Sequence, residues 1–223
     1  MQSVLVRARL PNKGLPLSSR AILPQLTVEQ DLWQRGLSLI AGVDEVGMGP
    51  LAGPVVAAAV VLPSVSALSH PLPQGVRDSK TLTAKARERL EQEIRRVAVG
   101  VGIGVVEVEE IDRINIYQAG LQAMRLALAQ LPAMPDHVLI DGRSVPGLPC
   151  PHTSFVKGDR EVYSIAAASI IAKVYRDRLM VALDAHYPEY GFARHMGYST
   201  MAHRLALLRF GPCPVHRRSF RLV

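Results

Sequence analysis

Four acidic residues of this chain stand where apolar segments end. Asp44 and Glu45 follow the apolar residues 39–43, Asp141 ends the apolar segment 137–140, and Asp159 lies in the short sequence VKGDRE. Ionised carboxylates beside buried strands need a partner or a metal ion. Oxygen ligands with open positions suit Mg²⁺ or Mn²⁺, which proteins often hold with a few carboxylates together with the phosphate oxygens of a substrate. The four acids therefore predict a site for a hard cation.

Some of these acids also have structural explanations. Asp159 could be the N-cap of the helix that follows it, and Asp141, just before Gly142, could be a turn residue. Asp44 and Glu45 are harder to explain in this way. Adjacent side chains on a strand face opposite sides of the sheet, so these two converge only if the strand ends there, and Gly47 is expected to provide that end.

The composition favours an anionic partner. The 223 residues carry a formal net charge of +7, which suits nucleic acid or a membrane surface without choosing between them. No apolar segment is long enough to span a bilayer, so no membrane association is expected. On a nucleic-acid-binding protein, two cations about 3.5–4 Å apart can activate a water and stabilise the leaving oxygen during phosphodiester cleavage.

The basic charge is concentrated at the C-terminus. From Tyr190 onward there is no acidic residue, and three histidines and several aromatic residues, among them Phe192, Tyr198, Phe210 and Phe220, accompany the arginines. The pattern predicts a phosphate-binding face, and a solvated basic tail is the alternative. The arginines concerned are Arg194, Arg204, Arg209, Arg217, Arg218 and Arg221.

The order of the expected elements is typical of an α/β domain. Thr27 and Gln30 predict a capping box that starts a short helix. Buried strands are expected at 39–44, 55–62 and 137–142, an alternating strand at 99–107 and a further strand at 152–156. Helices are expected at 83–97, 115–131, 160–183 and 201–209. The domains predicted from this pattern are a flexible N-terminal extension at 1–26, a catalytic domain at 27–183 and a basic C-terminal helical extension at 184–223.

Two further features bear on location and chemistry. The acid-free N-terminus contains prolines that would interrupt a targeting helix, so a cytoplasmic protein is expected. Cys150 and Cys213 lie near His152 and His216 with a spacing that matches no common zinc site, which favours reduced thiols.

Several motifs together resemble one known family. GVDEVGMGPLAGPVVAAAV, DSKTLT, VLIDG, KGD, ASIIAKVYRD, GYST and HRRSF are similar, in this order over about residues 41–220, to ribonuclease HII, the type 2 ribonuclease H family. The resemblance implies a ribonuclease H-like fold with a mixed five-stranded sheet flanked by helices and a C-terminal helical extension. It also implies endonucleolytic cleavage of RNA in RNA–DNA hybrids and in duplexes with a single embedded ribonucleotide, leaving 3′-hydroxyl and 5′-phosphate ends.

The resemblance also assigns cofactors and partners. It implies Mg²⁺ or Mn²⁺, with two ions in the substrate complex, and a role in ribonucleotide excision repair and DNA replication. A sliding clamp is a candidate partner, and the protein is expected to be a monomer.

Site residues carry over position by position. Asp44, Glu45, Asp141 and Asp159 match the catalytic acids and metal ligands. The backbone of the loop Gly47, Met48 and Gly49 would contact the ribose 2′-hydroxyl, and Tyr198 would stack on the next sugar. Phosphate contacts are expected from Ser79 and Lys80, with a helix-entry turn as the alternative, and from Lys173, which could instead be a surface lysine.

The chain departs from the family at two positions. Met48 stands where the family normally has arginine or lysine, and Met196 stands where lysine is common, so two expected cations are uncharged. A hybrid-binding protein with weakened or lost turnover is therefore an alternative function. A phosphatase of the haloacid dehalogenase type is a third, but it would need a D-x-D pair, and here Glu45 follows Asp44 directly.

Overall fold

The structure is a computed structural model of the chain, and it describes residues 23–64, 67 and 71–222. Most of the predicted N-terminal extension, residues 1–22, lies outside the described residues. Its last residues belong to the folded body, because the Gln25 N–H donates to the carbonyl of Glu161 at 3.0 Å and the Gln25 carbonyl accepts from the Tyr163 N–H at 3.1 Å.

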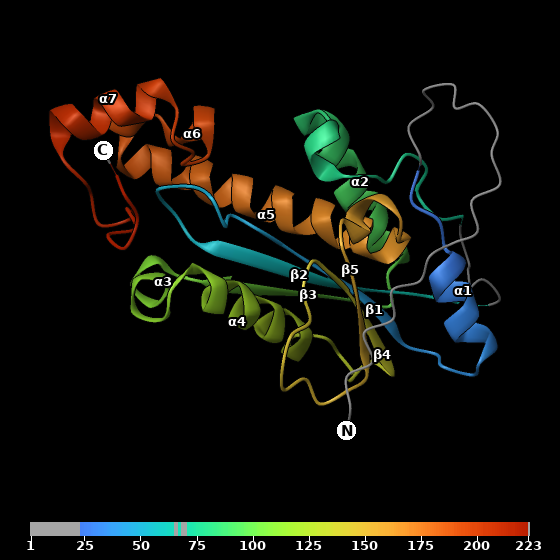
Figure 1. Cartoon of the computed structure of the whole chain (residues 1–223). Coiled ribbons are helices and arrows are strands. Elements are labelled where there is room, and N and C mark those ends of the chain that lie inside the picture. Colours follow the sequence, from blue (N-terminus) through green and yellow to red (C-terminus); the bar gives the residue numbers. More distant parts are fainter. Residues whose placement is uncertain (1–22, 65–66, 68–70, 223) are drawn as a thin grey trace, which may run out of the picture.

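A mixed five-stranded sheet forms the centre of the molecule, as predicted (Figure 1). The strand order is β3-β2-β1-β4-β5, with β1 antiparallel to β2, β2 antiparallel to β3, and β4 parallel to both β1 and β5. The strands are β1 (Ile40–Val46), β2 (Val55–Leu62), β3 (Gly100–Val106), β4 (His137–Asp141) and β5 (His152–Phe155).

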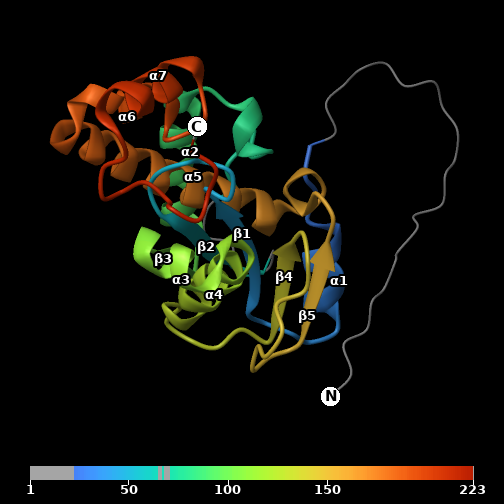
Figure 2. The ribbon, with the colours of Figure 1, turned by 60° about the vertical axis from the view of Figure 1, so that its left-hand side comes forward.

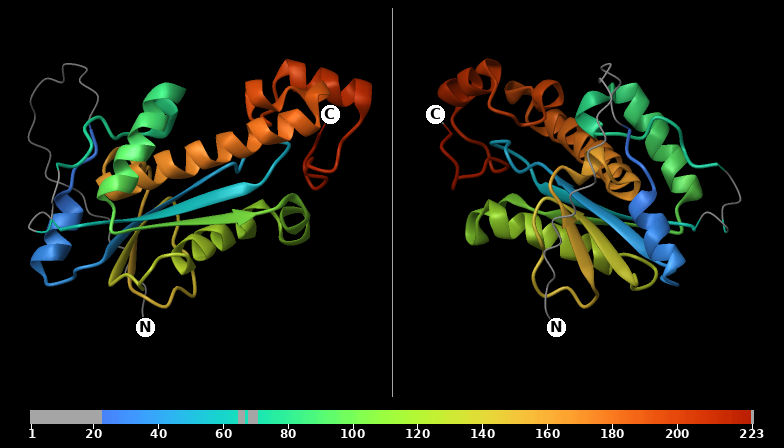
Figure 3. Two further views of the ribbon diagram at one scale, coloured as in Figure 1. Left: turned by 180° about the vertical axis from the view of Figure 1, so that it is seen from behind. Right: turned by 45° about the vertical axis from the view of Figure 1, so that its right-hand side comes forward.

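Helices cover both faces of this sheet. Helices α5 and α2 lie over one face and α4 and α3 over the other, and α6 and α7 pack near the C-terminal end of α5 (Figures 1, 2 and 3). Helix α1 lies toward the opposite end of the molecule (Figure 1). The helices are α1 (Thr27–Gln34), α2 (Ala84–Val97), α3 (Val108–Ile114), α4 (Ile116–Ala129), α5 (Tyr163–His186), α6 (Phe192–His195) and α7 (Met201–Phe210).

The central strands are buried on both faces, which explains their continuous apolar sequences. All eight residues of β2 are buried, as expected for a strand covered by helices on both sides. Gly42 in β1 brings α5 close to the sheet, because a Cβ there would meet the backbone of Ser164 and Ile165. A glycine at this position therefore sets α5 directly against the strand that carries Asp44 and Glu45.

Three local expectations need correction. Thr27 is already helical and Leu26 is the N-cap, with no side-chain capping bond, so the predicted capping box is absent. Helices α3 and α6 were not expected, because each spans only seven or four residues. The predicted domain limit at 183 falls inside α5, which continues to His186.

No helix among the described residues combines the length and the apolar character needed to cross a membrane.

Candidate active site

The four predicted acids come together at one edge of the sheet. Strand β4 runs parallel to β1 with Val43 opposite Ile140, so Asp44 and Asp141 follow at the same level of neighbouring strands. Asp159 lies in a 3₁₀ turn, Gly158–Arg160, that precedes α5. The Gly158 N–H donates to Oδ1 of Asp141 at 2.6 Å, which ties this turn to the end of β4.

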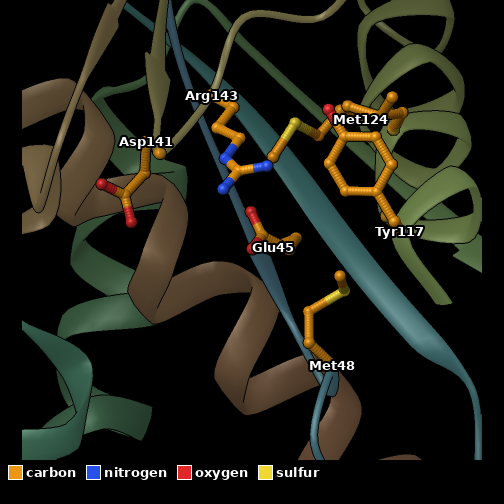
Figure 4. A pocket seen from close by; sticks show the side chains of 9 residues that line it. Glu45, Met48, Tyr117, Met124, Asp141 and Arg143 are labelled. Carbon is orange, nitrogen blue, oxygen red and sulfur yellow. The ribbon is translucent and has the colours of Figure 1, made fainter.

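Asp44 and Glu45 reach the site from opposite faces of the sheet. The prediction that the strand ends at these residues is wrong, because β1 continues to Val46. Asp44 therefore turns toward α5, where the Ser169 side chain contacts it, and Glu45 turns toward α4 and lines a cavity there (Figure 4). Asp141, at the end of the adjacent strand, lies close enough to interact electrostatically with both carboxylates, which links the two faces.

Burial and mutual repulsion raise the pKa of three of these acids. Desolvation, followed by the charges of Glu45 and Asp141, holds the pKa of Asp44 well above its usual range. Desolvation and then Asp141 raise the pKa of Glu45 to about 7. The same two causes raise the pKa of Asp159. A cluster of carboxylates with this property is stabilised when positive charge is placed among them.

Asp159 and Asp141 each had a structural alternative, as a helix N-cap and as a turn residue. Asp159 does not cap α5, because the N-cap is Val162. Asp141 does precede a turn, since Gly142 has φ +79°, but its carboxylate also takes part in the cluster. The turn and the cluster are therefore compatible.

Lys80 is the lysine that faces this cluster. Desolvation alone would lower its pKa, but the neighbouring carboxylates, led by Asp44 and Asp159, raise it overall. The Ser79 hydroxyl, by contrast, is buried and lies 2.9 Å from the Ser169 hydroxyl, which favours the helix-entry alternative for Ser79. Lys173 donates to Asp177 at 2.6 Å, and its side chain is only 14% exposed. Its ammonium group is thus already paired inside the protein.

The glycine-flanked loop and Tyr198 lie next to each other. A Cβ at Gly49 would be 3.9 Å from Cε1 of Tyr198, and the Tyr198 side chain is exposed. Gly47 has φ +95°, and a Cβ there would meet Pro54 O at 2.8 Å as well as the Arg176 side chain. Glycine at 47 is thus required by the backbone, whereas Gly49 borders open space beside Tyr198.

The Met48 side chain is half-buried. It packs against α4, with Sδ 3.0 Å from the position of a Cβ built on Gly120. It lines, with Glu45 and Asp141, a cavity of about 360 Å³ (Figure 4). Residue 48 therefore borders the acidic site, as the resemblance implies, although its side chain lies on an apolar wall.

Arg143 and Tyr117 line the same cavity and were not singled out from the sequence. The Arg143 guanidinium lies 6.0 Å from the centre of the Tyr117 ring. No carboxylate of the described residues forms an ion pair with Arg143. The signal available in the sequence was its place two residues after Asp141, at the end of a buried strand.

The basic C-terminal segment is only partly a surface. Arg217, His203, His216 and Phe192 are buried, so they cannot belong to the predicted phosphate-binding face. The other arginines of the segment are exposed: Arg194, Arg204, Arg209, Arg218 and Arg221.

The two cysteines are free. Cys213 is buried, with Sγ 3.1 Å from Nδ1 of His216. The His216 ring in turn packs against the rings of Tyr190, Phe192 and His203.

The donor chemistry at the acidic site fits a hard cation. The candidate ligands are all carboxylates, and three of them carry raised pKa values that neighbouring positive charge would relieve. As placed in residues 23–64, 67 and 71–222, however, no group of three or more histidine, cysteine or acidic side chains is arranged so that it could hold a metal ion. The carboxylates would have to shift to surround a cation.

The fold and these acids define a class of protein, the ribonuclease H-like hydrolases. A family model described as Ribonuclease HII matches residues 41–223. The chain is also 53% identical over 196 residues to the ribonuclease HII of Syntrophotalea carbinolica, covering 88% of this chain and 91% of the relative. It is 51% identical over 202 residues to that of Chloroflexus aurantiacus, covering 91% and 95%. The chain belongs to the ribonuclease HII family and is a ribonuclease H.

Solved structures show the same fold. Ribonuclease H2 of Pyrococcus horikoshii superposes with a TM-score of 0.69 at 28% identity, covering 82% of this chain and 94% of that one. The ribonuclease HII of Archaeoglobus fulgidus, solved in a complex with PCNA, gives a TM-score of 0.67 at 27% identity, covering 83% and 96%.

Proposed function

We propose that this ribonuclease H uses divalent cations to cleave the RNA strand of RNA–DNA hybrids and duplexes that carry a single embedded ribonucleotide, leaving 3′-hydroxyl and 5′-phosphate ends. The observation that carries the proposal is the convergence of Asp44, Glu45, Asp141 and Asp159 at one sheet edge, with their mutual electrostatic effects. The family membership supplies the substrate class.

The four carboxylates would hold two ions, Mg²⁺ or Mn²⁺. When bound, such ions supply an activated water and stabilisation of the leaving oxygen. The residues themselves set the position of the scissile phosphate, since Asp44 and Glu45 are fixed by β1, and Asp141 holds the turn of Asp159 through the Gly158 N–H. Lys80 and Arg143 are the cations that would face the substrate phosphates on either side of this cluster.

Recognition of the ribonucleotide is assigned to the loop Gly47–Gly49 and Tyr198. Only RNA carries a 2′-hydroxyl, and a backbone donor or acceptor can reach it where no side chain intervenes. The adjacency of exposed Gly49 and the exposed Tyr198 ring supports this assignment. Met48 would line the neighbouring wall without contributing a phosphate contact.

Partners and location follow the family. The PCNA complex of the archaeal relative supports a sliding clamp as a partner of this chain. A monomeric state, a cytoplasmic location and roles in ribonucleotide excision repair and replication stay predictions.

The direct test uses three labelled duplexes: an RNA–DNA hybrid, a DNA duplex with one ribonucleotide, and an all-DNA duplex. We expect cleavage of the first two, no cleavage of the third, loss of cleavage in chelator and recovery with Mg²⁺ or Mn²⁺. Mass spectrometry of the products should show 3′-hydroxyl and 5′-phosphate ends. Tight binding of the first two duplexes without cleavage in either metal would instead support the alternative of a hybrid-binding protein.

A further inference from the structure

Two arginines are completely buried next to the loop Gly47–Gly49. Arg176 comes from the middle of α5 and Arg217 from the segment after α7, and both side chains have 0% exposure. Neither forms an ion pair with an acid in the described part of the chain. Within the described residues, both side chains donate their hydrogen bonds to backbone carbonyls.

Arg217 holds both ends of the loop that begins at Gly47. Its Nη2 donates to Gly47 O at 2.6 Å and to Gly53 O at 2.8 Å, and its Nε donates to Gly53 O at 3.0 Å. Its Nη1 also donates to Met48 O at 3.3 Å. One planar guanidinium therefore fixes the distance across the loop.

Arg176 joins this loop to the segment that carries Tyr198. Its Nε donates to Pro54 O at 2.9 Å and its Nη2 to Ala52 O at 3.1 Å, while its Nη1 donates to Met196 O at 3.0 Å. Met196 itself has φ +52°, a conformation that costs free energy and persists where surrounding contacts hold it. Gly197 O also accepts from the Leu51 N–H at 2.8 Å, so the two segments are bonded directly as well.

The two positive charges of Arg176 and Arg217 are buried without a carboxylate partner among the described residues. Burying a guanidinium without a carboxylate is costly, and two close together repel each other. Carbonyl dipoles solvate the groups but do not neutralise them. Asp112, the acid that interacts with Arg217, accepts hydrogen bonds from the backbone of Arg218 and Ser219 instead. A polyanion bound over the loop would supply the missing negative charge.

We propose that Arg176 and Arg217 are positioning residues for ribonucleotide recognition, which fix the loop Gly47–Gly49 relative to Tyr198 and place positive charge behind a loop whose residue 48 is uncharged. This inference rests on the proposed function of that loop. It predicts that the planar arrangement of the guanidinium N–H donors, and not the positive charge alone, determines the preference for a ribonucleotide.

The test replaces each arginine by lysine, which keeps the positive charge but lacks the planar set of guanidinium N–H donors. Binding is measured in chelator, so that no cleavage occurs, to a duplex with one ribonucleotide and to an all-DNA duplex. In Arg217→Lys and Arg176→Lys we expect the preference for the ribonucleotide duplex to fall about tenfold, as for the loss of one charge-assisted hydrogen bond. Affinity for all-DNA duplex and its salt dependence should stay close to wild type.

A matched control separates positioning from a general loss of stability. Leu32→Ala removes a buried side chain from α1, at the far end of the sheet, and should lower stability while leaving the preference unchanged. An unchanged preference in both lysine variants, or an equal fall in Leu32→Ala, would overturn the inference. A wild-type protein that does not prefer the ribonucleotide duplex would instead refute the proposed function of the loop.

A measurement on the wild-type protein covers the case in which neither lysine variant folds. The amides of Leu51, Gly53 and Arg217 are bonded across the segments that the arginines join. Hydrogen–deuterium exchange at these amides should slow together on adding the ribonucleotide duplex, and less on adding all-DNA duplex. Slowing in only one of the segments would contradict their coupling.

Discussion

Gly47 and Gly49 flank the same methionine, but the structure predicts opposite responses to alanine. At Gly47 the backbone is left-handed, with φ +95°, and a Cβ would meet Cδ of Arg176 and the carbonyl oxygen of Pro54, each at 2.8 Å. At Gly49 the φ is ordinary and the nearest atom to a Cβ is Tyr198 Cε1 at 3.9 Å, which is a normal contact. The two substitutions add the same methyl group two residues apart.

The expected cost at Gly47 has two parts. An L-residue in the left-handed region costs about 1–2 kcal/mol. Displacing Arg176 from Pro54 O, now 2.9 Å away, sacrifices a buried charge-assisted bond worth about 1.5–3 kcal/mol. Gly47→Ala should therefore lose about 3 kcal/mol in the free energy of unfolding, or roughly 6–12 °C in Tm for a chain of this size.

Urea and thermal unfolding of both variants measure these costs. Gly49→Ala should unfold within about 0.5 kcal/mol of wild type, as is usual for a surface substitution, and serves as the matched control. A Gly47→Ala variant as stable as wild type, or an equally destabilised Gly49→Ala variant, would show that the backbone does not require glycine at 47.

Three further predictions concern substrate binding and pH. Tyr198→Ala should weaken binding of the ribonucleotide duplex by about 1–3 kcal/mol through lost stacking and Tyr198→Phe by much less; equal losses in equilibrium binding would assign the role to the hydroxyl. Arg143→Gln should weaken hybrid and DNA binding alike and reduce the slope of log K against log salt by about one, and an unchanged slope would place Arg143 away from the phosphates. Burial, followed by the charge of His203, lowers the pKa of the His216 imidazole to about 4. As the pH falls, this imidazole is therefore protonated in the unfolded chain before it is protonated in the folded protein. The contribution of neutral His216 to the free energy of unfolding is therefore complete above about pH 6.5 and should fall, by up to about 3 kcal/mol, toward pH 4. The urea midpoint of unfolding should therefore decrease more steeply with falling pH in wild type than in His216→Asn. Equal pH dependences of the two midpoints would be inconsistent with a lowered pKa of His216.

The strands and long helices could be predicted because burial leaves a direct mark on sequence. The apolar run of β2 and the small residues of α5 follow from a sheet covered on both faces. The short helices α3 and α6 have too few residues for a periodic pattern. The capping box failed because its Thr-x-x-Gln spacing is also compatible with a helix that begins one residue earlier.

The acids of the site could be predicted, but their geometry could not. The parallel register between β1 and β4 places Asp44 and Asp141 at the same level of neighbouring strands. Glu45 faces the other side of the sheet because β1 continues through it to Val46. Arg217 looked like a surface cation because a charged residue carries no sequence mark of burial. Its partners are backbone carbonyls of a loop about 165 residues earlier, and only tertiary structure brings them together.

The substitution Asp141→Asn tests whether the carboxylates form one cation-dependent catalytic site. The substitution preserves shape and the bond that Oδ1 accepts from the Gly158 N–H, but removes one negative charge from the cluster. Cleavage of a duplex with one ribonucleotide should collapse at saturating Mg²⁺, while the variant binds that duplex at least as tightly as wild type, because negative charge beside the phosphate is reduced. Cleavage by Asp141→Asn at a near wild-type rate would show that the carboxylates do not form such a site.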